Sequence, residues 1–199
     1  MQVDNLYVMH LMNGLDFKDL SVWGELGTIP RDDLFKDLLE SFNKKPLKIF
    51  QIGAIESLSS QYRIGSGWSE LFWGEYIKQN GGELAVVDIN IDHIAHSSFL
   101  ATNFQYQTYF HVNDAINVIT DGYDIYYLDG AGISQISDAH EQTLNQFKKI
   151  EHTKSLVIVD DVPTKAKLLV SYLDERGIAY KNHDHANGMI TIDLRGLNE

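Results

Sequence analysis

The strongest constraint on the fold of this chain is an alternation that begins after Pro46. Short apolar runs follow one another along the chain, separated by stretches in which apolar residues recur at helical spacing. Strands that are apolar on both faces are typical of a parallel sheet covered by helices on both sides. Five such runs predict strands at 47–52, 83–89, 108–112, 123–128 and 155–159.

The end of the chain departs from this alternation. Two strand-like runs, 178–182 and 189–194, are joined by the sequence His-Asp-His-Ala-Asn-Gly. A short loop rich in turn-forming residues between two such runs predicts a hairpin, so the last strand is expected to be antiparallel. The sequence therefore predicts an α/β fold with a mostly parallel sheet of seven strands that ends in an antiparallel β-hairpin.

Helices are predicted from the spacing of apolar residues. We expect helices at 30–43, from Trp68 to Tyr76, behind Asp138 and Glu141, which are spaced as a capping box, and at 164–176. We further expect residues 1–45 to form an N-terminal helical extension that covers the acceptor substrate, and residues 46–199 to form the α/β domain.

Composition excludes several classes of function. The 199 residues carry a formal net charge of -12, opposite in sign to the basic surface that nucleic acids select. The chain has no cysteine, so thiol chemistry and disulfides are excluded. It has neither a basic signal-peptide region nor an apolar run long enough to span a membrane. We expect a cytoplasmic protein with a small-molecule partner, no nucleic-acid or membrane partner, and either one copy or a homo-oligomer.

The ends of the predicted strands carry the candidate binding residues. Ligands of open α/β sheets bind outside the carboxyl ends of the strands, so these positions are the ones to examine first. In chain order, the strands are followed by Gly53, Asp88, Asp114, Asp129 and the pair Asp160-Asp161. Asp88 also lies about 20 residues after the glycines of the segment 65–69, Gly-Ser-Gly-Trp-Ser, as in a nucleotide-binding βαβ unit.

This pattern resembles the class I S-adenosylmethionine-dependent methyltransferases over roughly residues 46–195. The resemblance implies a Rossmann-like three-layer sandwich and S-adenosylmethionine (SAM) as cofactor, with Asp88 accepting hydrogen bonds from the ribose hydroxyls. The cofactor contacts that it implies are Gly53, Ala54, Gly65, Gly67, Trp68, Ser69, Asp88, Ile89, Asp114, Ala115 and Asp129.

The Asp-Gly after the fourth strand and the Asp-Asp after the fifth are similar to small-molecule O-methyltransferases of the catechol and antibiotic-tailoring type. This similarity implies O-methylation of a small molecule, a magnesium ion held by Asp129, Asp160 and Asp161, and Asp129 and Asp160 as catalytic residues. Carboxylate oxygens on two rigid strands suit a hard divalent cation. His111, which lies at the end of the third strand, is the candidate base.

Each of these assignments has a purely structural alternative. The glycines can be ordinary turn residues, Asp88 and Asp114 can cap the helices that follow them, Trp68 can pack in the core, and the three clustered aspartates can face water. The sequence also departs from the family, because Gln51 replaces an acid in the first strand and the stretch after Asp129 lacks a histidine or lysine base.

Two other functions stay open at this stage. A protein that kept the fold and lost the chemistry, and binds SAM or a nucleoside or serves a structural role, fits the altered glycine loop. An NAD-dependent oxidoreductase fits less well, because Glu70 stands at the third glycine position of the dinucleotide motif.

Overall fold

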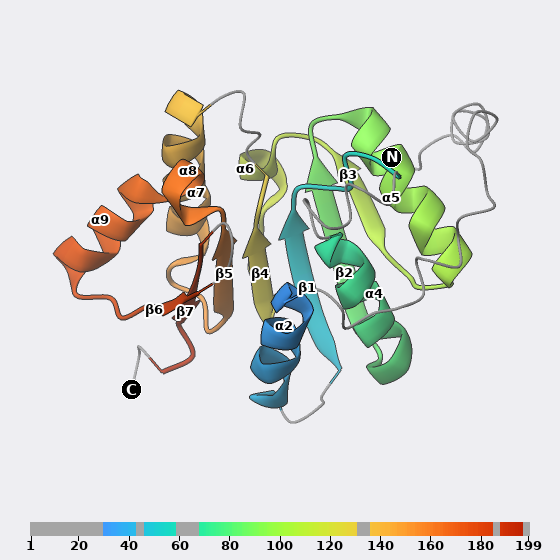
Figure 1. Ribbon diagram of the computed structural model, residues 1–199, viewed down its shortest axis with the longest axis horizontal. Helices are drawn as coiled ribbons and strands as arrows, with labels where there is room; N and C mark the ends of the chain where they lie inside the picture. The colour runs from blue at the N-terminus through green and yellow to red at the C-terminus, as the bar shows by residue number, and fades with distance from the viewer. Residues whose placement is uncertain (1–29, 43–45, 59–67, 131–135, 185–187, 197–199) are drawn as a thin grey trace. The chain divides into compact units, whose positions relative to one another are not determined.

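The computed structural model describes residues 30–42, 46–58, 68–130, 136–184 and 188–196 (Figure 1). Its central feature is a seven-stranded sheet with the strand order β3-β2-β1-β4-β5-β7-β6. The strands span Leu47–Ile52 (β1), Gly82–Asp88 (β2), Tyr109–Val112 (β3), Ile125–Leu128 (β4), Leu156–Asp160 (β5), Lys181–His183 (β6) and Met189–Asp193 (β7).

The strand directions match the expected pattern. β1 pairs with β4, β4 with β5, and β2 with β3, all in parallel. β7 pairs antiparallel with β5 and with β6. The predicted α/β fold, its mostly parallel sheet and its terminal antiparallel hairpin are therefore confirmed, with strand ends at most three residues from those expected.

The chain comprises two compact units. The first contains residues 1–47 and 54–112, and its helices are α2 (Pro30–Glu40), α4 (Ser69–Asn80) and α5 (Ile91–Phe104). Its apolar core includes Phe35 of α2 and Trp73 of α4, both fully buried, with ring centroids 4.3 Å apart. Helix α2, placed by sequence in an N-terminal extension, thus packs directly on α4.

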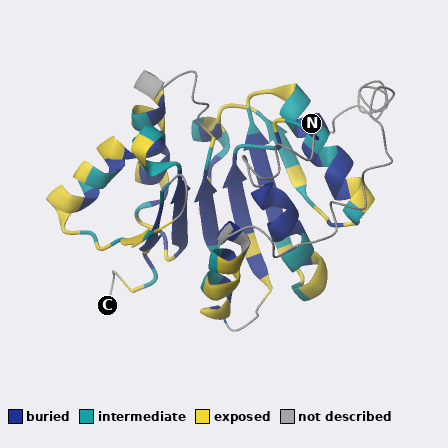
Figure 2. Cartoon of the chain, viewed as in Figure 1, coloured by how far each residue is buried: buried dark blue, intermediate teal, exposed yellow. Residues whose placement is uncertain are grey.

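The second unit contains residues 48–53 and 113–199. Its helices are α6 (Ala115–Val118), α7 (Ile136–Ile150), α8 (Val162–Lys165) and α9 (Lys167–Arg176). All residues of β4 and β5 are buried, as the dark blue strands in Figure 2 show. This burial explains why these strands are uninterrupted apolar runs in the sequence.

Two helix predictions are corrected. Helix α7 begins at Ile136, so Asp138 lies inside its first turn and the predicted capping box is wrong. The helix expected over 164–176 is two helices, because Ala166 has φ −125° and ψ 13° and interrupts the helical backbone. No helix in the described part of the chain is long and apolar enough to cross a membrane.

Candidate functional site

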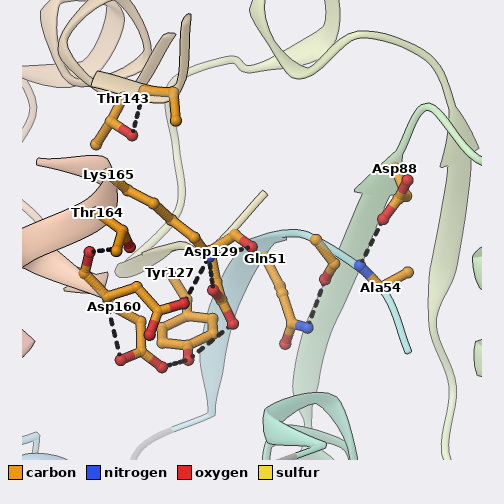
Figure 3. Close-up of polar contacts among 12 residues, drawn as sticks. Gln51, Ala54, Asp88, Tyr127, Asp129, Thr143, Asp160, Thr164 and Lys165 are labelled. Atoms are coloured by element: carbon orange, nitrogen blue, oxygen red, sulfur yellow. Dashed lines mark hydrogen bonds and ion pairs between the residues drawn. The ribbon is translucent and has the colours of Figure 1, made fainter. Parts of the chain in front are cut away.

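Asp88 of the first unit is the predicted binding residue with the most defined surroundings. It ends β2, and its side chain is 11% exposed. Oδ2 accepts a hydrogen bond from the backbone N–H of Ala54 at 3.0 Å (Figure 3). Oδ1 accepts one from Asn90 N–H at 2.8 Å. Both backbone contacts fix the carboxylate at the carboxyl end of its strand.

The capping alternative for Asp88 is not what the structure shows. Helix α5 begins after Asn90, and the side chain of Asn90 accepts from the N–H of Asp92. Asp88 is therefore available for another role. Ile89, directly after it, is 70% exposed and presents an aliphatic side chain next to Asp88.

His93 is a neighbour of Asp88 that the sequence analysis missed. Its Nδ1 lies 3.2 Å from Asp88 Oδ2. The hydrogen bond with Asp88 raises the pKa of His93, burial opposes this, and the negative charges of Asp88, Glu56 and Asp92 add to the increase. The only signal in the sequence is the position of His93, one turn into the helix that follows an acidic strand end.

Gly53 of the second unit occupies a position that only glycine can fill. Its φ is +94°, and a Cβ there would lie 2.6 Å from the carbonyl oxygen of Asp129. The Asp129 N–H also donates to Ile52 O at 3.1 Å, so the ends of β1 and β4 are in direct backbone contact. This packing is a structural reason for Gly53 that is independent of any ligand.

Gln51 lies on the same strand end and is 3% exposed. Its Nε2 donates to the carbonyl oxygen of Gly53 at 2.7 Å. Its Oε1 is buried and has no hydrogen-bond partner among the described residues. A buried acceptor of this kind is expected to have a donor, because leaving it unsatisfied costs free energy.

Lys165 of α8 joins two of the predicted aspartates. Its Nζ donates to Asp129 Oδ1 at 2.6 Å and lies 2.9 Å from Asp161 Oδ2 (Figure 3). The lysine side chain is 7% exposed and each aspartate side chain 20%. Burial opposes the charged form, but the charges and hydrogen bonds of Asp129 and Asp161 outweigh it and raise the pKa of Lys165 well above its ordinary value. Lys165 is therefore an ammonium at all physiological pH values.

Asp160 is buried, with 2% exposure, and its hydrogen bonds involve other groups. Its Oδ2 accepts from the Tyr127 hydroxyl at 2.7 Å and its Oδ1 from the Asp161 N–H at 2.9 Å. The Tyr127 hydroxyl also lies 3.3 Å from Asp129 Oδ2. Because it has one proton, it donates to the nearer oxygen, on Asp160.

These contacts do not support the predicted magnesium site. The two carboxylates that face each other, Asp129 and Asp161, enclose the Lys165 ammonium, and the third, Asp160, turns into the protein. Magnesium needs an octahedral shell of oxygens at about 2.0–2.1 Å. The residues present do not fit that requirement, and the described part of the chain contains no group of three metal-binding side chains.

The other predicted site residues differ in burial and in hydrogen bonding. Trp68 is buried and its Nε1 donates to Ser57 O at 3.1 Å, which favours packing. Ser69 and Ala115 are buried as well, whereas Asp114 is exposed and caps α6 by accepting from Ile116 N–H at 3.1 Å. His111 lies on β3 and is half-buried. Gly65 and Gly67 lie outside the described residues.

Glu70, which stands at the third glycine position of the dinucleotide motif, is fully buried in the first turn of α4. Burial raises its pKa to about 7, although hydrogen bonds from Ser97 and Tyr106 act in the opposite direction. Tyr106 donates to its Oε1 at 3.0 Å. Ser97 Oγ also accepts from the N–H of Ile55, so it links Glu70 to the segment after Gly53.

Comparison with known proteins gives a fold but no family. No protein-family model and no curated protein matches the sequence. Among solved structures, the chain is similar to SAH-bound Podospora anserina methyltransferase PaMTH1, with 15% identity, a TM-score of 0.59, and coverage of 96% of this chain and 94% of that one.

Two further similar structures have different printed descriptions. Magnesium protoporphyrin IX methyltransferase (ChlM) from Synechocystis PCC 6803 with bound SAM is 12% identical, with a TM-score of 0.56 and coverage of 94% and 96%. A putative rRNA-methylase from Clostridium thermocellum is 14% identical, with a TM-score of 0.53 and coverage of 79% and 96%. At these identities the similarity shows the fold alone, which is a Rossmann-like α/β fold.

Proposed function

We propose that this chain is a SAM-dependent methyltransferase. The observation that carries the proposal is the strand end at Asp88, where a carboxylate is held by two backbone N–H groups beside an exposed aliphatic side chain, Ile89. Ribose hydroxyls donate to such a carboxylate, and one face of the adenine ring packs on such an apolar surface. The similar structures described with SAM or SAH support the same cofactor.

In the second unit, we propose Gly53 and its neighbour Gln51 as further cofactor contacts. Gln51 Oε1 is a buried acceptor in need of a donor, and the α-ammonium of SAM is a strong one. The positive φ of Gly53 leaves this turn without a side chain, so a ligand can approach its backbone. Gly65 and Gly67 stay candidates for the same end of the cofactor.

Methyl transfer requires little covalent chemistry from the protein. SAM, when bound, would supply the methyl group: its sulfur–methyl bond would break with the electron pair left on sulfur, giving S-adenosylhomocysteine, while the methyl carbon bonds to an acceptor oxygen. The hydroxyl proton passes to a base. The protein contributes positioning and proton removal. His111 is the proposed base, because Asp129 is paired with Lys165 and Asp160 is buried.

We further propose a small molecule with a hydroxyl group as the acceptor, covered by residues 1–45. The net charge of -12 disfavours a phosphate backbone. Incubation with methyl-labelled SAM separates the acceptor classes, because label in ribosomal RNA rather than in small phenols or sugars would contradict this assignment.

Cofactor binding is tested by calorimetry with SAM and S-adenosylhomocysteine on the wild-type chain and on Asp88→Asn. Hydrogen bonds to a charged group contribute about 1.5–3 kcal/mol, so the variant is expected to bind roughly 10- to 150-fold more weakly. The control, Asp37→Asn, changes an exposed aspartate on α2 and is expected to bind like the wild type.

A ligand analogue makes this test specific to the ribose. A cofactor with 2′-deoxyribose is expected to bind the wild type more weakly than SAM, and Asp88→Asn should lose most of that discrimination. If the wild type binds neither SAM nor S-adenosylhomocysteine at about millimolar concentration, the proposal is wrong.

A protein that binds the cofactor without transferring methyl groups is the second candidate. It is favoured by the pairing of Asp129 with Lys165, which occupies a residue expected to act in catalysis. Tight binding of SAM together with no transfer to any hydroxyl, amine or RNA acceptor would select this function.

A further inference from the structure

We propose that the Lys165 ammonium serves as a built-in cation at the ends of β4 and β5, and that Lys165 prevents this strand edge from binding a divalent metal. The inference concerns how the acidic strand ends are neutralised, and it holds whether or not the chain transfers methyl groups. It rests on the contacts of Lys165 with Asp129 and Asp161.

The ammonium uses the oxygens that a metal would need. Asp129 Oδ1 is 2.6 Å from Nζ, Asp161 Oδ2 is 2.9 Å away, and the carbonyl oxygen of Asp129 is 3.4 Å away. An ammonium has three N–H donors, and all three of these contacts involve the two aspartates. A divalent cation on the same oxygens would lie within a few ångströms of a fixed positive charge, so the two cations exclude each other.

The backbone around Lys165 holds it in this position. Asp161 has left-handed dihedral angles, φ 54° and ψ 43°, directly before the four-residue helix α8, which ends at Lys165. Lys165 therefore lies one helical turn after Asp161, and the interruption at Ala166 separates it from α9. With 7% of its side chain exposed, Lys165 is part of the packed interior rather than a mobile surface lysine.

Asp160, the last residue of β5, is held by separate hydrogen bonds. Its carboxyl group is directed to the Tyr127 hydroxyl and to the Asp161 N–H. Each of its oxygens therefore already accepts a hydrogen bond from within the protein. At this strand edge, Asp160 thus accepts from a hydroxyl and a backbone N–H, while Asp129 and Asp161 share an ammonium.

The test compares the wild type with Lys165→Met and with Lys154→Met, which removes an exposed lysine of the same unit. Binding of Mn²⁺ is measured by electron paramagnetic resonance in the absence of SAM, so failure of the proposed function does not affect the result. We expect Lys165→Met to bind one Mn²⁺ at least about tenfold more tightly than the other two proteins. Addition of Asp129→Asn to this variant should abolish the gain.

The proposal can still be tested if Lys165→Met does not fold without metal. Mn²⁺ should then restore the folding of Lys165→Met. The variant that combines Lys165→Met with Asp129→Asn and Asp161→Asn should fold without metal, because it has removed both carboxylates that Lys165 neutralises. A wild-type Mn²⁺ site that is weakened by Asp129→Asn would overturn the proposal. So would a folded Lys165→Met that binds Mn²⁺ no better than Lys154→Met.

Discussion

The buried carboxyl group of Glu70 makes a quantitative prediction about pH and stability. In the folded chain its pKa is about 7, raised by burial from the ordinary value of 4.5. The folded state therefore binds this proton more tightly than the unfolded state. The contribution of Glu70 to stability is most favourable below about pH 4.5 and declines as the pH rises through about 7. Above that window it is constant.

The magnitude follows from the same two values. Each pKa unit corresponds to about 1.4 kcal/mol, so the interval from 4.5 to about 7 corresponds to roughly 3 kcal/mol lost from the free energy of unfolding. Glu70→Gln removes this titration. Its amide oxygen can accept from Tyr106, and its amide N–H₂ can donate to Ser97 Oγ. We expect the variant to gain roughly 3 kcal/mol relative to the wild type between about pH 4.5 and pH 8.

The assay is urea unfolding at several pH values across this window, with the free energy of unfolding of the variant compared with that of the wild type at each pH. Glu40→Gln, an exposed glutamate on α2, is the control and should show no such trend. If the difference between Glu70→Gln and the wild type does not change with pH, Glu70 does not titrate in this window and the reasoning from its burial is wrong.

Two further predictions concern packing. Gly53→Ala places a Cβ 2.6 Å from the Asp129 carbonyl oxygen, whereas Gly177→Ala has a similarly positive φ and no atom within 4 Å. In urea unfolding, Gly177→Ala should lower the free energy of unfolding by about 1 kcal/mol, and Gly53→Ala should lower it by at least about 1 kcal/mol more. Equal losses of unfolding free energy would contradict the close contact at Gly53. Phe35→Ala should cost about 3–5 kcal/mol because the ring is fully buried against Trp73. If a thermal scan shows the same melting temperature for Phe35→Ala and the wild type, the packing of α2 does not contribute to stability.

The sheet could be predicted from the sequence because strands buried on both faces have few alternatives. The runs at 47–52 and 155–159 are mainly apolar, and β1 and β5 lie there within a residue of the expected bounds. Helix boundaries were less predictable, since they depend on local backbone angles. The interruption at Ala166, for example, leaves no trace in the apolar spacing of 164–176.

One candidate binding residue could be placed from the sequence alone. Asp88 is a charged residue at the end of an apolar strand, and its position alone marks it. The pair Asp160-Asp161 shows the limit of this approach, because β5 ends at Asp160 and the left-handed backbone at Asp161, which directs its side chain, leaves no signal in the sequence. Lys165 follows Asp161 by four residues, a spacing that predicts an ion pair on a helix. Its contact with Asp129 depends on the packing of α8 and could not be predicted.

The backbone contact between the β1 and β4 ends also determines where this protein can be varied. A side chain at Gly53 would meet the Asp129 carbonyl, and one at Gly130 would lie 2.3 Å from Ile52 Cγ2. Substitution libraries aimed at new ligand preferences would therefore lose most members at these two positions to misfolding. Ile89 is exposed and lies outside these strand contacts, so its side chain can be varied without disturbing the packing of the sheet.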